Sequence, residues 1–227
     1  SMYGAVDLMI VGKFAQSADV SAVSTGSQIM MTITNLLTSF AMGTTILLGQ
    51  RIGEGRGREG GKVIGSSICL FAAIAGLLTF LIPVLSRPLS SIMNAPAEAF
   101  DETAAYIRIC GFGSLFIVSY NLIGSIFRGI GDSKTPLMTV LIACVCNIAG
   151  DLLLVAVFHM GTAGAAVATV IAQAISVAAS LLILRRRGLP FSFGKQDLRF
   201  QGDIIRIVTK LGIPIALSDL LVGISFL

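Results

Sequence analysis

Long apolar stretches separated by short charged segments are the main pattern of this sequence. Four stretches contain no charged residue, namely 20–50, 63–86, 109–127 and 160–184. Each is long enough to cross a bilayer once, because a hydrocarbon core of ~30 Å is crossed by about 20 helical residues. Two further stretches carry one acid each: 136–158 contains Asp151, and 211–227 contains Asp219. The pattern predicts an all-α integral membrane protein.

The predicted elements form a six-helix transmembrane bundle followed by the start of a seventh helix. We expect the six helices at about 1–12, 20–50, 63–86, 105–127, 136–158 and 162–185. The first is too short to cross alone and the seventh is still running at residue 227, so we expect a fragment that continues at both ends. Residues 1–187 would form an N-terminal transmembrane lobe, and 211–227 would begin a truncated C-terminal lobe. Residues 188–210 would connect them in the cytoplasm, ending in an amphipathic helix.

The composition narrows the class of protein further. Hydrophobic residues make up 55% of the 227 residues, charged residues only 12%, and the mean hydropathy is +0.90. Soluble domains carry roughly a quarter charged residues, so a soluble enzyme and a nucleic-acid-binding protein are both excluded. The four cysteines lie in apolar stretches and the only histidine is His159. These residues offer no disulfide framework, zinc site or catalytic triad, so we expect no enzymatic activity and no cofactor.

The basic residues are distributed unevenly between alternate loops. Three of the 16 fall on one side of the predicted bundle, Lys13, Arg87 and Arg108, and all the others fall on the opposite side. By the positive-inside rule, the loops rich in basic residues face the cytoplasm. We therefore expect a multi-pass protein of the cell membrane, either plasma or inner, in contact with the lipid bilayer.

Three acids lie inside the predicted spans: Asp7, Asp151 and Asp219. An ionisable residue at membrane depth is costly and is by default a candidate for function. Asn147 precedes Asp151 by four residues, so the two side chains share one helix face. A carboxylate and an amide oxygen are hard donors suited to a small cation, and in a dry bundle the carboxylate would hold a proton instead. The alternative is a buried acid that only forms hydrogen bonds between helices.

Two predicted helices also carry narrow polar stripes. Gln28, Thr32, Asn35 and Ser39 follow helical spacing in one, and Thr169, Gln173, Ser176 and Ser180 follow it in the other. Such a stripe fits a water-filled or ligand-lined cleft, and it equally fits interhelical hydrogen bonding. For the single serines and threonines we favour the structural interpretation. For Gln28, Asn35 and Gln173 both remain open.

Five short motifs, in order along essentially the whole chain, resemble the N-terminal half of a MATE (multidrug and toxic compound extrusion) transporter. They are Val6-Asp7 with Val11-Gly12, Phe127-Arg128-Gly129-Ile130-Gly131-Asp132-Ser133-Lys134-Thr135-Pro136, Asn147 with Asp151, Gly161-Thr162-Ala163-Gly164-Ala165-Ala166-Val167-Ala168-Thr169, and Leu211-Gly212-Ile213-Pro214-Ile215-Ala216-Leu217-Ser218. The resemblance implies a twelve-helix transporter built from two six-helix lobes. It also implies export of drugs or metabolites in exchange for Na⁺ or H⁺.

The resemblance assigns site residues by motif position. The cation or proton site would be formed by Asp7, Asn121, Asn147, Asp151 and Thr169, with Na⁺ binding at Asp7, Asn147 and Asp151. Tyr106 would line the substrate cleft. The polar stripes, rather than the resemblance, add Gln28, Asn35 and Gln173 as cleft-lining candidates. The expected partners are a small cationic or amphipathic substrate and the missing C-terminal lobe of the same protein.

The function that we predict is therefore secondary active antiport of drugs, toxic compounds or metabolites against Na⁺ or H⁺. The alternative is a lipid-linked oligosaccharide flippase of the same superfamily, which would need a cationic cleft, and no Lys or Arg lies mid-span in the complete helices. A membrane enzyme would need a catalytic set that the sequence does not offer. A purely structural membrane protein would leave Asp7 and Asp151 unexplained.

Overall fold

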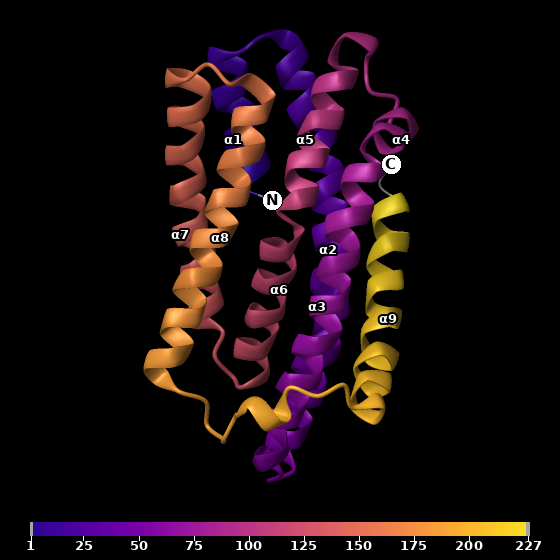
Figure 1. The fold of residues 1–227 in the computed structure, drawn as a ribbon, viewed down its shortest axis with the longest axis vertical. Helices are drawn as coiled ribbons and strands as arrows, with labels where there is room; N and C mark the ends of the chain where they lie inside the picture. The colour runs from indigo at the N-terminus through magenta and orange to yellow at the C-terminus, as the bar shows by residue number, and fades with distance from the viewer. Residues whose placement is uncertain (1, 226–227) are drawn as a thin grey trace. The chain divides into compact units, whose positions relative to one another are not determined.

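The computed structural model describes residues 2–225, and the side chains of residues 7–221. No strand occurs in the described part of the chain, so the predicted all-α class is confirmed. The α-helices in chain order (Figure 1) are α1 Met2–Phe14, α2 Ser17–Gly53, α3 Gly60–Val84, α4 Ser86–Ile92, α5 Phe100–Phe112, α6 Ser114–Gly129, α7 Lys134–Asp151, α8 Gly161–Arg187 and α9 Gly202–Ser225. A π-helical segment, Leu152–Val157, follows α7, and short 3₁₀ turns lie at Gly57–Glu59, Ala97–Ala99 and Lys195–Asp197. The side chain of Val6 and residues 226–227 of the expected seventh helix lie outside the described residues.

Four helical segments of the described chain are long and apolar enough to cross a membrane: Ser17–Gly53, Gly57–Val84, Lys134–Val157 and Gly161–Arg187. Many large apolar side chains on these segments are exposed, among them Phe80 and Val145. Exposed apolar surface on this scale suits contact with lipid rather than water. The segments agree with the predicted membrane spans.

The span predicted at 105–127 differs from the structure. It is a broken span in which Ala97–Phe112 and Ser114–Gly129 meet at an angle of 54°. Gly113 lies at the break, where a Cβ atom would come within 2.5 Å of Cγ2 of Val170. The missing side chain thus allows close approach to α8, a tertiary constraint that hydropathy alone does not reveal. Part of the expected preceding loop is also helical: it contains α4, which packs against α5.

The connector differs from expectation as well. The expected separate amphipathic helix before residue 211 is instead the beginning of α9, which runs without interruption from Gly202 to Ser225 and contains Pro214. Residues 188–201 contain one 3₁₀ turn and no α-helix. The start of α9 is held by packing, since Val208 is buried and a Cβ on Gly43 of α2 would collide with its carbonyl oxygen. Small residues permit such close helix contacts.

The helices group into two compact units. The first unit comprises Ser1–Met31, Gly76–Ile117 and Val140–Ser176, and the second unit comprises Thr32–Ala75, Val118–Thr139 and Val177–Leu227. In the first unit, α1 packs against the π-helical segment, and Val11, Val23 and Ile107 are fully buried. In the second unit, Phe71 and Leu48 are buried core residues. The candidate functional site lies within the first unit.

Candidate functional site

Two acids from different helices meet inside the first unit. Asp7 of α1 and Asp151, the last residue of α7, are 1% and 0% exposed, and their carboxyl groups lie close enough to interact directly. No ion pair to Lys or Arg involves either acid among the residues that the structure describes. Two facing carboxylates without a cationic partner cannot both remain charged at low cost in a buried setting.

Asn147 and Thr169 complete the cluster around these acids. The Nδ2 atom of Asn147 donates to Oγ1 of Thr169 over 3.4 Å, and that hydroxyl donates to the carbonyl oxygen of Ala165 over 3.0 Å. The carboxyl of Asp7 lies beside both side chains. The structure therefore brings together four of the five residues predicted for the cation or proton site. We call Asp7, Asn147, Asp151 and Thr169 the acid cluster.

The acid cluster contains more acceptor atoms than donors. Four of its buried oxygens have no hydrogen-bond partner among the described residues: Oδ1 of Asp7, Oδ1 of Asn147 and both carboxyl oxygens of Asp151. A buried acceptor without a donor is costly. Such a set of oxygens is suited to receive a proton or a small hard cation such as Na⁺. Within the described chain, no group of three or more His, Cys, Asp or Glu residues is arranged so that it could hold a metal ion.

Small residues on α7 and α8 explain how Thr169 comes to lie beside Asn147. A Cβ on Gly150 would lie 2.9 Å from Cβ of Ala168, and one on Gly164 would lie 3.2 Å from the backbone of Leu154. Glycine at both positions lets the two helices approach closely. The π-helical turn that begins directly after Asp151 widens the backbone there, and π-helical segments frequently occur at functional sites.

Tyr106 lies beside the acid cluster. It is buried, its hydroxyl interacts with Thr169, and Asp7 lies near it. Its ring packs against α2 at Gly26, where a Cβ would come within 2.6 Å of Cδ1 of the ring. The family resemblance suggested that Tyr106 lines a substrate cleft, which stays a prediction; in this structure the side chain is buried near Asp7 and Thr169. Gly26, which the sequence analysis did not single out, is what makes room for it.

The remaining predicted site residues are Asn121, Gln28, Asn35 and Gln173. Asn121 belongs to the second unit, where its Oδ1 accepts a hydrogen bond of 2.5 Å from Oγ1 of Thr38. Gln28 and Asn35 are exposed on α2, and Gln173 of α8 is half-buried. The third candidate acid, Asp219, is exposed on α9 and accepts a hydrogen bond from the hydroxyl of Ser39.

Asp132 accepts several hydrogen bonds at the start of α7. From the sequence it was known only as part of a family motif. Its Oδ1 accepts hydrogen bonds from the backbone N–H groups of Lys134 and Thr135, both at 3.0 Å. Its Oδ2 accepts from the Thr135 hydroxyl at 2.6 Å and from Arg187 at 3.1 Å. The hydrogen bonds from Thr135, ahead of the one from Lys134 and the charge of Arg187, lower the pKa of Asp132 below its usual value. The residue caps the start of α7; the spacing Asp132-Ser133-Lys134-Thr135 is the signal that could have revealed this.

Asp19 has a similar capping role in the first unit. Its Oδ1 accepts from the backbone N–H of Thr162 at 3.0 Å and from the hydroxyl of the same residue at 2.7 Å, at the start of α8. Its Oδ2 accepts from the backbone N–H of Gln16 at 3.1 Å. Nothing in the local sequence indicates a partner more than a hundred residues away, so this contact could be found only in the folded chain.

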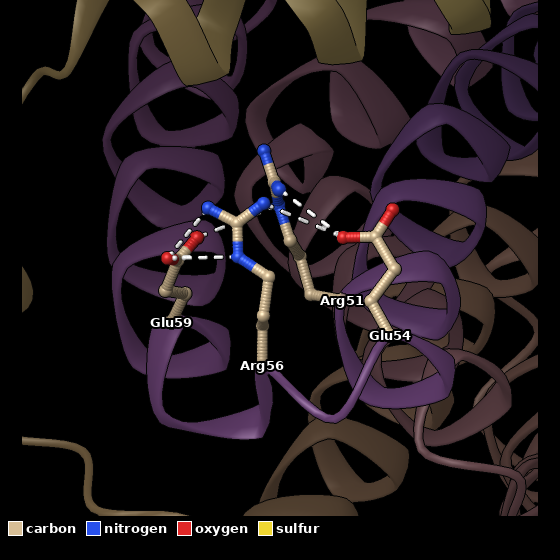
Figure 2. Close-up of polar contacts among 4 residues, drawn as sticks. All are labelled: Arg51, Glu54, Arg56 and Glu59. Atoms are coloured by element: carbon tan, nitrogen blue, oxygen red, sulfur yellow. Dashed lines mark hydrogen bonds and ion pairs between the residues drawn. The ribbon is translucent and has the colours of Figure 1, made fainter.

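The turn between α2 and α3 carries a network of exposed ion pairs. Figure 2 shows Arg56 between Glu54 and Glu59, with Arg51 beside it. The Arg56–Glu59 pair is 2.8 Å long, and Arg51 lies 3.4 Å from Glu54 and 3.6 Å from Glu59. Gly55 adopts φ +72, which suits glycine in this tight turn. The network links the end of α2 to the turn before α3, and its side chains are partly or largely exposed.

Comparison with known proteins identifies the family of this chain. The sequence model of the MatE family matches residues 1–153 of this chain. The chain belongs to the MatE family. It is 26% identical to the probable multidrug resistance protein YoeA of Bacillus subtilis (strain 168), over 97% of this chain and 49% of that protein. It is 27% identical to the probable multidrug resistance protein YpnP of the same strain, over 96% of this chain and 48% of that protein. The predicted membership of the MATE family is thus confirmed.

Solved structures share the fold of this MatE chain. A crystal structure of a MATE protein in its bent conformation matches with a TM-score of 0.91 and 24% identity, over 99% of this chain and 50% of that one. An outward-facing multidrug resistance transporter of the MATE family matches with a TM-score of 0.89 and 22% identity, over 99% of this chain and 50% of that one. The chain spans about half the length of the relatives it matches.

The family membership supports two broader conclusions. The MatE chain is a multi-pass membrane protein, as its apolar spans predict. The relatives named here are transporters rather than enzymes, which fits the expectation of a non-enzymatic protein. They are described as multidrug proteins, so the alternative of a lipid-linked oligosaccharide flippase is not favoured.

Proposed function

We propose that this chain forms the N-terminal lobe of a secondary active antiporter that exports small molecules in exchange for H⁺ or Na⁺. The observation that carries the proposal is the pairing of Asp7 with Asp151, both buried, with carboxyl oxygens that no described residue satisfies. The arrangement calls for one positive charge. A single proton shared by the two carboxyls would meet this need, and so would one Na⁺ held by the oxygens of Asp7, Asp151 and Asn147.

Coupling follows from the cost of leaving the acids charged. When a cation loads, burying the two carboxyls becomes less costly, so the conformation in which they are most enclosed is favoured. When the cation leaves, repulsion between the carboxylates favours a conformation in which water or a substrate reaches them. A ligand can shift such an equilibrium only by its difference in affinity between the two states. An imposed gradient of the cation would thereby change the side of the membrane to which the transport pathway opens.

The substrate class follows from the same charge. A site that carries two uncompensated carboxylates when empty attracts cationic or amphipathic cationic molecules, which compete with the coupling ion. The multidrug description of the relatives supports a small-molecule substrate of this kind. The remaining expected partners are the bilayer and a second lobe, for which the half-length match to the relatives is the support.

The test uses the full-length protein reconstituted in vesicles, with the cationic dye ethidium as substrate. Asp151→Asn removes the charge but keeps the size, and it should reduce gradient-driven efflux strongly under both an imposed Na⁺ gradient and an imposed pH gradient. The matched control is Asp101→Asn, the same change at an exposed acid paired with Arg87, which should leave efflux intact. Undiminished efflux by Asp151→Asn would contradict the proposal. The gradient that drives efflux in the unmodified protein identifies the coupling ion.

A further inference from the structure

One charged side chain of the second unit has no role in the cation mechanism. Arg128 lies in the last turn of α6 and is half-buried. Its Nε and Nη2 atoms are both buried and have no hydrogen-bond partner among the residues that the structure describes. The ion pairs found in the described chain do not include it. From the sequence, this arginine is expected on the cytoplasmic side of the membrane.

The two unsatisfied nitrogens belong to the same edge of the guanidinium. The N–H bond of Nε and one N–H bond of Nη2 point in the same direction, and this edge binds a carboxylate or phosphate through two parallel hydrogen bonds. The guanidinium folds back along its own helix, because Gly124 has no side chain there: a Cβ on Gly124 would lie 3.4 Å from Nη1. One complete oxyanion-binding edge is therefore buried in the second unit without a partner among the described residues.

Among the described residues, no acid acts on Arg128, and a buried apolar cluster lies on the same helix. The titratable side chain that acts on it is Tyr120, one turn beyond Gly124 on the same helix. Ile123, Phe127 and Val177 form a buried cluster from α6 and α8, bordered by the half-buried side chains of Tyr120, Ile130, Ile183 and Leu184. A cation in such a setting is costly unless an anion pairs with it. A ligand with an anionic head and an apolar chain would satisfy both features.

From this geometry we infer that Arg128 binds the oxyanion group of an amphipathic ligand, with the ligand's apolar chain on the cluster bordered by Tyr120, Ile130, Ile183 and Leu184. The group is a phosphate or a carboxylate, since both match the free guanidinium edge. An anionic lipid and an exported amphipathic acid are two sources of this chemistry. The inference goes beyond the proposed function, because a positive charge would repel the cationic substrates that the acid cluster attracts.

The first arm of the test measures binding to the full-length protein in dodecyl maltoside. The probes are dodecyl phosphate and its uncharged analogue dodecanol, and the readout is the rise of the thermal midpoint with probe concentration, which reports the apparent affinity. The unmodified protein should prefer dodecyl phosphate. Arg128→Gln should weaken that binding by about tenfold or more, as expected for charge-assisted hydrogen bonds. Arg128→Lys keeps the charge but loses the two-pronged edge and should be intermediate.

The control for this arm is Arg186→Gln, which removes the same charge from an exposed position near the end of α8 in the same unit. It should keep the preference for dodecyl phosphate. Equal binding of the two probes by the unmodified protein would overturn the inference whether or not Arg128→Gln folds, and so would an unchanged preference in Arg128→Gln or Arg128→Lys.

The second arm separates the two sources. If the ligand is a lipid, phosphatidylglycerol should displace dodecyl phosphate from the unmodified protein while phosphatidylcholine does not. If the ligand is an exported acid, gradient-driven efflux of a fluorescent fatty acid from vesicles should fall in Arg128→Gln while ethidium efflux persists. The inference would be overturned if phosphatidylglycerol did not compete and fatty-acid efflux did not fall in Arg128→Gln. Retained ethidium efflux in Arg128→Gln keeps this outcome distinct from a failure of the proposed antiport.

Discussion

Helix α7 has an aspartate at each end, and the two are treated in opposite ways by the fold. Asp132, just before the helix begins, receives hydrogen bonds from two backbone N–H groups, one hydroxyl and one arginine. Asp151, at the helix end, is completely buried, and neither of its carboxyl oxygens has a hydrogen-bond partner among the described residues. A carboxylate whose acceptors are satisfied stabilises the fold. One whose acceptors are left open beside a second acid is available to bind and release a positive charge.

The largest effect that would separate the two acids is expected at Asp151. Asp151→Asn should reduce gradient-driven efflux by about tenfold or more, which corresponds to about 1.4 kcal/mol or more. The thermal midpoint in detergent should stay the same or rise, because an amide does not bring a buried charge. Combining Asp7→Asn with Asp151→Asn should cost no more activity than either change alone, since residues that act as one unit are not additive. Independent, additive losses would contradict a shared site.

A smaller effect of the opposite kind is expected at Asp132. Asp132→Ala should lower the stability by about 1 kcal/mol, the usual cost of losing a helix cap, measured as a fall in the thermal midpoint. Efflux per folded molecule should be unchanged. Asp132→Asn is the control, because its side-chain oxygen can still accept from the backbone of Lys134 and Thr135, and it should recover much of the loss. A defect in efflux that stability does not explain would remove the distinction between the two acids.

The pH dependence of stability should sharpen the comparison. The pKa of Asp132 is lowered in the folded state, first by the hydrogen bonds from Thr135. A lowered folded pKa means that the stabilisation is fully present above the unfolded value, roughly 3.9, and is lost as the pH falls through the folded value. The unmodified protein should therefore lose more stability than Asp132→Asn on acidification below about pH 4. If the thermal midpoints of the two proteins fell in parallel, the ionised Asp132 carboxylate would not stabilise the fold as stated.

The smallest effect is expected for the exposed ion pairs between α2 and α3. Arg56→Gln removes the contacts to Glu54 and Glu59 shown in Figure 2. Exposed pairs of this kind contribute about 0.2–1 kcal/mol, and salt screens them. The thermal midpoint should change little, and efflux should not change. A large loss would mean that this turn has a role beyond closing the loop, which its exposure does not suggest.

The membrane spans and the pair Asn147 and Asp151 could be predicted because they depend on local properties. Hydropathy over about 20 residues predicts a membrane helix, and a spacing of four residues places two side chains on one helix face. The break at Gly113 and the continuous α9 could not be predicted in this way. Each depends on a partner distant in the sequence: Val170 packs against the break, and Gly43 packs against the start of α9. A backbone that bends or continues because of such a partner leaves no signal in hydropathy.

What the sequence determined by itself is therefore the class of protein, the positions of most spans, and the three acids at membrane depth. Only the tertiary structure decided which of these acids meet. It brought Asp7 against Asp151, left Asp219 exposed beside Ser39, and left Nε and Nη2 of Arg128 without a partner among the described residues. The physical reason is that the state of a buried charge depends on the donors and acceptors that surround it in space. Those neighbours come from helices far apart in the chain, and glycines allow these helices to pack closely.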